Sequence, residues 1–374
     1  MKISLAATNP CHLFPLALEL HAAGALGRYY SGYPAWKLRV PAGFPLRTHS
    51  LRTNVVYGLL RLPPRLRPAG KSLFLWQDHG FDRWVGRHLE ACDFFHAMPG
   101  QALETFRAAR RMGVRTVLNH ATGPVRDWVR IMQPEYSRAG LRLTDVCPYD
   151  ERYFAREDEE YALADFHCAA STVVRDQLLA RGVAADRIWL VPYGADPAFF
   201  HPGTNQPPDR FRIIFAGQLG LRKGLRTLLD ALTAAGDPGW EVHFYGSVSP
   251  EAATDLAAYR GAVPLHFHGA ISQAALGDAF RLGSILVLPS LEEGFGLVVP
   301  QAMSCGLPAI VSDRVGARDL IRHRANGSIF PTEKAEALAT ELRWWSGNRI
   351  RVDEHFPWAE PARRMILFAS ASLS

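Results

Sequence analysis

The fold of this 374-residue chain is most clearly predicted by the segment Leu286-Val-Leu-Pro-Ser-Leu-Glu-Glu-Gly-Phe-Gly-Leu-Val-Val-Pro-Gln-Ala-Met-Ser-Cys-Gly-Leu-Pro308. The apolar run over 285–288 predicts a buried parallel strand. A turn over 292–296 then precedes a predicted helix over 297–305, which Gly306 and Pro308 bring to an end. A second apolar run, 309–311, restarts a strand. The stretch is therefore one parallel strand–turn–helix–strand crossover.

The turn combines features of a phosphate site and of a sugar site. Free N–H groups at a helix start attract anions, and Gly294 and Gly296 let a ligand approach the backbone closely. Glu293 precedes these donors, and a carboxylate accepts hydrogen bonds from sugar hydroxyl groups. The pattern therefore favours a nucleotide-sugar site over an ordinary strand–loop–helix with a glycine turn.

Glu293-Gly-Phe-Gly-Leu297, followed by Gln301-Ala-Met-Ser-Cys-Gly-Leu-Pro308, resembles the signature of family-4 retaining glycosyltransferases of the GT-B fold. In that family one glutamate lies by the donor sugar and a second lies by the nucleotide ribose. Glu293 matches the first, whereas Gln301 replaces the second and would accept a ribose hydroxyl without charge. The resemblance implies an α/β chain with two facing doubly wound Rossmann-like domains and a cleft between them.

A second motif begins at Phe211 and resembles the donor-phosphate motif of the same family. Its lysine is kept as Lys223, while Gln218 stands where the family often has an arginine, so we expect Arg222 to supply that charge. A loop that starts at Gly269 resembles the one whose main chain meets the nucleobase. The donor-binding set implied by the resemblance is Gly217, Gln218, Arg222, Lys223, Gly269, Glu293, Gly294, Phe295, Gly296, Leu297 and Gln301.

The first half of the chain alternates short strands and helices, which predicts a parallel sheet. Residues 3–7 read as its first strand rather than as a signal peptide, and Asn9 follows that strand. His120 follows another predicted strand, at the edge where open α/β sheets bind ligands. A structural or capping role is the alternative for this histidine. The predicted catalytic residues are Glu293, His120 and Lys223.

The predicted domains are an acceptor-side domain over 1–203, a nucleotide-sugar domain over 204–352, and a terminal helix within 353–374 that crosses back to the first domain. The linker signal is the proline-containing polar stretch near 203–210. Between 31 and 70 the only long element expected is a helix over 53–60, and a strand tip is expected over 74–77. The acidic cluster within 151–160 is interpreted as a solvated helix face.

Charge is unevenly distributed, although the net charge is only +6. The chain has no Asp or Glu between Glu19 and Asp78, and this stretch contains the cations Arg28, Lys37, Arg39, Arg47, Arg52, Arg61, Arg65, Arg67 and Lys71. Such a stretch predicts contact of residues 28–71 with an anionic membrane, at about 1 kcal/mol per cation near the surface. The alternative is a solvated basic face, and the sequence has no nucleic-acid-binding module.

Five scattered cysteines indicate a reducing compartment, so we expect a cytoplasmic protein. The basic stretch would bring it to the inner face of the plasma membrane. His243, His266 and His268 lie in predicted strands, but no carboxylate is evident near them, so no metal site is expected.

The sequence thus predicts a metal-independent retaining glycosyltransferase that needs no cofactor. It would move a hexose-type sugar from a UDP- or GDP-linked donor to a glycan or lipid-linked acceptor, in polysaccharide or glycolipid synthesis. The alternatives are a catalytically degenerate sugar- or partner-binding scaffold and a nucleotide-sugar epimerase. A nicotinamide dehydrogenase is disfavoured because no Gly-x-Gly-x-x-Gly follows the first strand.

Overall fold

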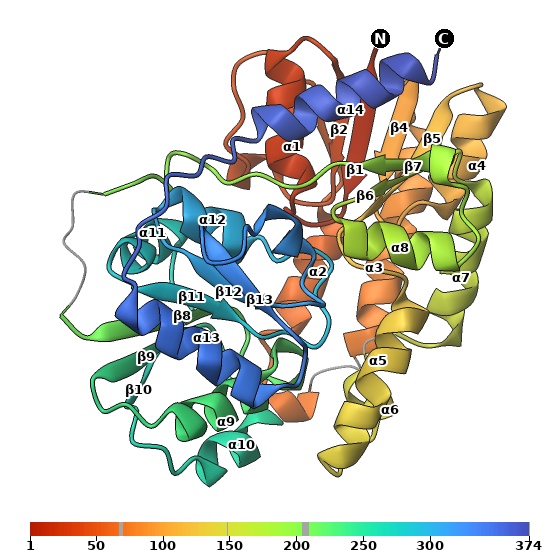
Figure 1. Ribbon diagram of the computed structural model, residues 1–374. Coiled ribbons are helices and arrows are strands. Elements are labelled where there is room, and N and C mark those ends of the chain that lie inside the picture. Colours follow the sequence, from red (N-terminus) through yellow and green to blue (C-terminus); the bar gives the residue numbers. More distant parts are fainter. Residues whose placement is uncertain (67–69, 148, 204–208, 374) are drawn as a thin grey trace.

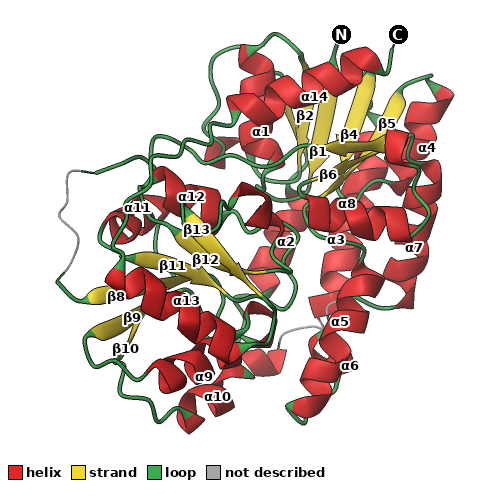
Figure 2. Cartoon of the chain, viewed as in Figure 1, coloured by secondary structure: helices red, strands yellow, loops and turns green. Residues whose placement is uncertain are grey.

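The computed structural model describes residues 1–66, 70–147, 149–203 and 209–373. Within these ranges the chain forms two parallel sheets, and helices cover both faces of each sheet (Figures 1 and 2). The first sheet has the strand order β3-β2-β1-β4-β5-β6-β7 and the second has the order β10-β9-β8-β11-β12-β13. This arrangement confirms the predicted pair of doubly wound α/β sheets.

The first sheet and its helices occupy the amino-terminal half of the chain. Its strands are β1 (Ile3–Ala7), β2 (Leu26–Ser31), β3 (Leu46–Thr48), β4 (Phe94–Ala97), β5 (Arg115–His120), β6 (Phe166–Ala169) and β7 (Ile188–Leu190). Its helices are α1 (Leu13–Ala22), α2 (Leu51–Leu59), α3 (Gly70–Arg87), α4 (Leu103–Arg111), α5 (Val125–Arg138), α6 (Leu143–Val146), α7 (Glu151–Leu163) and α8 (Thr172–Ala180).

The second sheet follows the same plan. Its strands are β8 (Phe211–Ala216), β9 (Trp240–Tyr245), β10 (Leu265–Gly269), β11 (Ile285–Leu288), β12 (Ala309–Ser312) and β13 (Gly327–Phe330). Its helices are α9 (Leu225–Ala235), α10 (Ala252–Ala258), α11 (Gln273–Arg281), α12 (Val298–Ser304) and α13 (Ala335–Gly347), and α14 (Ala359–Ala371) ends the chain. Two 3-10 turns matter below, η4 (Leu221–Lys223) and η5 (Gly316–Leu320).

The chain crosses from one domain to the other twice, and the two connecting segments lie side by side. The amide of Ala195 donates to the main-chain oxygen of Phe356 at 2.7 Å. After the second connecting segment, α14 packs against α1 of the first domain (Figure 1), and Phe368 stacks on Trp189 with ring centroids 5.9 Å apart. The exact boundaries at 203 and 352 stay a prediction.

One apolar core runs from the first sheet into the second. Tyr193, in the first connecting segment, lies 5.1 Å from Phe295 and 5.9 Å from Trp358, measured between ring centroids. All three side chains are at most 7% exposed. Because apolar burial contributes about 25 cal/mol per Å², this continuity holds the two domains against each other.

The structure corrects the expectations for the early part of the chain. Residues 74–77 belong to helix α3 and not to a strand tip, since a short apolar run alone does not distinguish the two. The strands β2 and β3 were not predicted. No helix in the described ranges is long and apolar enough to cross a membrane.

Candidate functional site

Two cations from the second domain converge on two carboxylates at the end of β11. Lys223, the last residue of η4, pairs through Nζ with Oε2 of Glu293. Arg222 places Nη1 3.4 Å from the same oxygen and 3.4 Å from Oε2 of Glu292, and it donates to the main-chain oxygen of Glu292 at 3.0 Å. The predicted residues Lys223, Arg222 and Glu293 are therefore brought together.

The charges in this cluster are largely withdrawn from solvent. Burial raises the pKa of the Glu293 carboxyl, but the charges of Lys223 and Arg222 outweigh it, and the net pKa lies below the ordinary value. Burial lowers the pKa of Lys223, and Glu293 offsets part of that effect. Burial raises the pKa of Glu292. A bound anion could take the place of Glu293 beside the two cations, because both carry donors that suit oxygen anions.

Glu292 was not predicted as part of the site, although its side chain is only 5% exposed and faces Arg222. The adjacent pair Glu292-Glu293 in the sequence could have indicated its role. Two adjacent carboxylates after a buried strand need cations close by, since an unpaired buried charge is costly.

Two glycines allow the close approaches that build the cluster. Gly224 has a φ of 69°, and a Cβ there would lie 1.9 Å from the main-chain oxygen of Pro289, so η4 could not reach the end of β11 with any other residue. A Cβ on Gly294 would lie 2.3 Å from the main-chain oxygen of Ala121. Gly294 thus brings the loop after β11 into contact with the loop after β5.

The start of α8 in the first domain also contacts the loop after β11 and the neighbouring turn η5. Ser171 donates to the main-chain oxygen of Gly294 at 2.6 Å, and Thr172 donates through its amide to Asp319 of η5 at 2.7 Å. Beside η4, Met132 and Tyr136 of α5 pack on Leu221 and Leu291 in one apolar cluster. The two domains therefore meet around the cluster of Lys223, Arg222, Glu292 and Glu293.

The remaining predicted donor residues lie around the same edge of the second sheet. Gly217 and the exposed Gln218 follow β8, and Gly269 ends β10, where its oxygen accepts from the amide of Gly246 at 2.8 Å. Gly296 has a φ of 92° in the turn before α12. Phe295 is buried against Tyr193, so its side chain belongs to the core.

Gln301 and Leu297 face the first domain across a pocket of about 390 Å³. The other lining residues include Cys11 and His12 at the start of α1, and Gln273 at the start of α11. Asn9, in the same turn as Cys11, accepts from the hydroxyl of Tyr57 at 3.2 Å. The pocket thus joins Gln301, the predicted ribose residue, to the first turn of the predicted acceptor-side domain.

His120 does not join the cluster. Its ring is 1% exposed, with Nε2 3.0 Å from Nδ1 of His167 and Nδ1 3.3 Å from the hydroxyl of Tyr161. Burial lowers the pKa of His120 well below its ordinary value. Both ring nitrogens are engaged within the first domain, so this placement matches the structural alternative, and the catalytic role stays a prediction.

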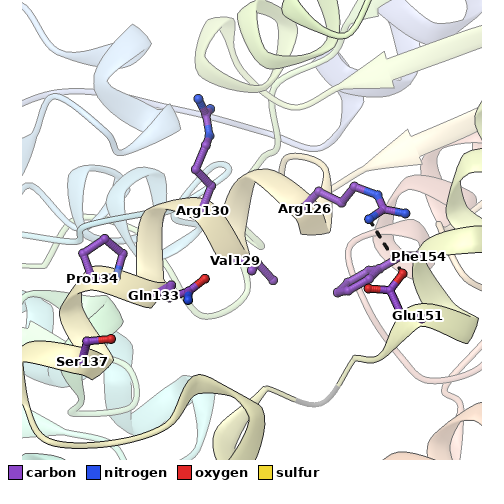
Figure 3. A pocket seen from close by; sticks show the side chains of 8 residues that line it. All are labelled: Arg126, Val129, Arg130, Gln133, Pro134, Ser137, Glu151 and Phe154. Carbon is purple, nitrogen blue, oxygen red and sulfur yellow. Dashed lines mark ion pairs between the residues drawn. The ribbon is translucent and has the colours of Figure 1, made fainter.

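A separate pocket of about 580 Å³ lies between α5 and α7 of the first domain (Figure 3). Arg126 points toward Glu151 and Phe154 at one end, whereas Arg130 points away from that pair. None of its lining residues belongs to the predicted site.

Part of this chain is similar in sequence to known glycosyltransferases. Residues 198–364 match the family described as glycosyl transferases group 1. Sulfoquinovosyl transferase SQD2 of Arabidopsis thaliana is 28% identical over 194 residues, covering 48% of this chain and 37% of that protein. A D-inositol 3-phosphate glycosyltransferase of Streptomyces griseus is 28% identical over 297 residues, covering 71% and 62%. The chain thus spans less than two thirds of the length of either relative.

A solved structure shows the same fold over the whole chain. Anabaena HepE in complex with UDP superposes with a TM-score of 0.62 at 14% identity, covering 100% of this chain and 98% of HepE. This likeness extends the comparison to the first domain, which the family match does not include. The chain therefore has the GT-B fold, and its residues 198–364 are similar to the glycosyl transferases group 1 family.

Proposed function

We propose that this protein is a retaining glycosyltransferase. It moves a hexose-type sugar from a UDP- or GDP-linked donor to a glycan or lipid-linked acceptor in cell-surface polysaccharide or glycolipid synthesis. The observation that carries the proposal is the buried cluster of Lys223, Arg222 and Glu293 beneath the domain contact at Gly294. The relatives' names, which describe transferases of sugars, and the UDP bound to HepE support it.

The cluster suggests how the donor is held and activated. The diphosphate replaces Glu293 as the partner of Lys223 and Arg222, whose charges stabilise the negative charge that develops as the sugar–phosphate bond breaks. Glu293 is then released to accept hydrogen bonds from the sugar hydroxyl groups. In this scheme two protein cations neutralise the leaving group, so the reaction needs no metal ion. The contacts at Gly294 exclude water when the domains close.

The acceptor enters from the first domain, on the side of Asn9 and the loop after β5. Gln301 meets the donor ribose across the pocket that it shares with His12. Retention at the anomeric carbon is what the family resemblance implies.

Thermal unfolding with a panel of nucleotides and nucleotide sugars tests the proposal, with EDTA present throughout. A ligand at about 100 times its dissociation constant should add about 2.7 kcal/mol to the unfolding free energy. A shift with one nucleoside diphosphate and its sugars, abolished by Lys223→Ala, is the expected result. If none of the nucleotides shifts the transition, the donor site is wrong.

A degenerate scaffold is the second candidate, and Gln218 and Gln301 favour it because both lack the charge that the family carries. The double substitution Gln218→Arg with Gln301→Glu separates the two. An active protein should show at most a few-fold gain in donor affinity. A scaffold should gain donor binding that the natural chain lacks.

We also propose that the protein works in the cytoplasm, where residues 28–71 contact the inner face of the plasma membrane. Arg67 lies outside the described residues. Apolar side chains in this stretch are exposed next to its basic residues, including Trp36 at 79%, Leu51 at 68% and Leu66 at 67%. Such side chains insert into an interface while arginines bind anionic headgroups.

A further inference from the structure

A group of metal-ligating side chains lies on the outer part of the second sheet. No metal site was expected here from the sequence, because no carboxylate was evident near the histidines of β9 and β10. The structure corrects this point. Glu241 lies on β9 with His243, and ligand atoms of Glu241, His243 and His266 all fall within 4.8 Å of one another.

The strand geometry explains why these three side chains converge. β9 and β10 are parallel, and His243 stands opposite His266 in the register. Side chains of opposite residues share one face of a sheet, and so do residues two apart on one strand, which places Glu241 beside the pair. The two imidazole rings lie 4.7 Å apart between centroids. β10 is the last strand of the sheet (Figure 1), and His266 is exposed there.

One ring nitrogen in the group is buried and lacks a partner. Nε2 of His243 has no hydrogen-bond partner among the described residues, and it lies 3.4 Å from Oε1 of Glu241. Two ligands of a tetrahedral zinc ion stand about 3.3 Å apart, given zinc–nitrogen and zinc–oxygen distances near 2 Å. A nitrogen and a carboxylate oxygen at this spacing therefore suit a shared cation.

Two neighbours hold the ligands in place. Nδ1 of His243 lies 3.0 Å from Nε2 of His268, a contact that fixes the imidazole orientation, as the outer partners of metal-binding histidines do. Arg212 donates from Nε to Oε1 of Glu241 at 2.7 Å. This bond fixes the carboxylate, but the guanidinium charge also lowers the affinity for a cation.

We propose that Glu241, His243 and His266 bind one divalent transition-metal ion of the zinc type, with the remaining coordination position open to solvent. Two imidazoles and one carboxylate form a ligand set that zinc accepts. The ion would tie the edge strand β10 to β9 and so steady Gly269 at the end of β10. The site shares no residue with the Lys223–Glu293 cluster, and the proposed function does not require the ion.

Titration of untagged, EDTA-stripped protein with Co²⁺ tests the site through the visible absorption bands of the bound ion. A single equivalent should bind, Zn²⁺ should displace it, and Zn²⁺ should raise the unfolding temperature. His266→Ala and Glu241→Gln should abolish stoichiometric binding. His268→Ala should weaken it by about 10- to 100-fold, because this residue only orients His243.

His201→Ala is the matched control, since His201 is exposed and lies outside the group, and it should bind Co²⁺ as the natural chain does. His266 is also exposed, so its replacement should leave the fold intact, which circular dichroism verifies. Absence of saturable binding, or equal binding by all variants, would overturn the proposal.

Discussion

The hydroxyl of Ser171 in the first domain donates to the main-chain oxygen of Gly294 in the second domain across 2.6 Å. The same hydroxyl oxygen accepts from the amide of Val174 at 3.2 Å and thereby caps α8. One buried side chain therefore begins a helix and closes the domain contact over the candidate donor site.

The substitution Ser171→Ala should lower the unfolding free energy by more than the loss of an ordinary helix cap does. Losing the cap costs about 1 kcal/mol, and leaving the buried oxygen of Gly294 unpaired costs about 1–3 kcal/mol more. We expect a loss of about 2–4 kcal/mol in the unfolding free energy, measured by urea denaturation. Ser272→Ala removes only the cap of α11 and should cost about 1 kcal/mol. Equal losses for the two variants would contradict a closed domain contact in solution.

Lys223→Met should weaken binding of the nucleoside diphosphate by about 10- to 100-fold, because it removes a charge-assisted contact of about 1.5–3 kcal/mol. The same change should lower stability, since it leaves the Glu293 carboxylate with Arg222 alone. Adding Glu293→Gln should restore stability but not binding. Calorimetric titration and urea denaturation of both variants provide the two measurements, and recovery of binding by the double variant would exclude a phosphate role for Lys223.

His96 should make the protein sensitive to acid. Its ring is fully buried, and neither nitrogen has a hydrogen-bond partner among the described residues, so burial lowers its pKa to about 3 from the ordinary 6.5. Below pH 6.5 the unfolded chain binds a proton that the native chain does not, and stability falls as the pH drops through that value. At about pH 5 the loss from this group is about 2 kcal/mol.

His96→Leu removes that dependence. Between neutral pH and about pH 5, the variant should lose about 2 kcal/mol less stability than the natural chain, measured by urea denaturation. His201→Leu, at an exposed position, should lose as much as the natural chain. The hypothesis fails if the two variants respond to pH alike.

Neutralising Arg61 and Arg65 together should weaken binding to anionic vesicles. Each cation contributes about 1 kcal/mol, so the double change to Gln should raise the dissociation constant about 30-fold. Arg110 and Arg111 are exposed on α4, outside the basic stretch, and their double change is the matched control. Sedimentation with vesicles that contain anionic lipid gives the measurement. Unchanged binding in the Arg61 and Arg65 variant would remove the membrane proposal.

In helix α7, the charge pattern along the sequence predicted the wrong environment for one residue. Glu160 was interpreted as part of a solvated face, because charges clustered on a helix usually point to water. The structure buries it completely, and it accepts from the amides of Gly100, Ala102 and Leu103. Burial raises its pKa to about 7, although Arg156 opposes the shift. A carboxylate that satisfies the start of a distant helix cannot be recognised from the spacing within its own helix.

The parallel crossovers and the placement of Lys223 and Glu293 in turns that follow strands could be predicted from the sequence, because these features depend on residues close together in the chain. Periodicity, glycine turns and helix stops are local signals. The tertiary structure was needed to show that His120 faces the interior, that Ser171 contacts Gly294, and that Glu241 lies beside two histidines. Those relationships depend on strand order and on domain contact, which join residues that no local spacing brings together.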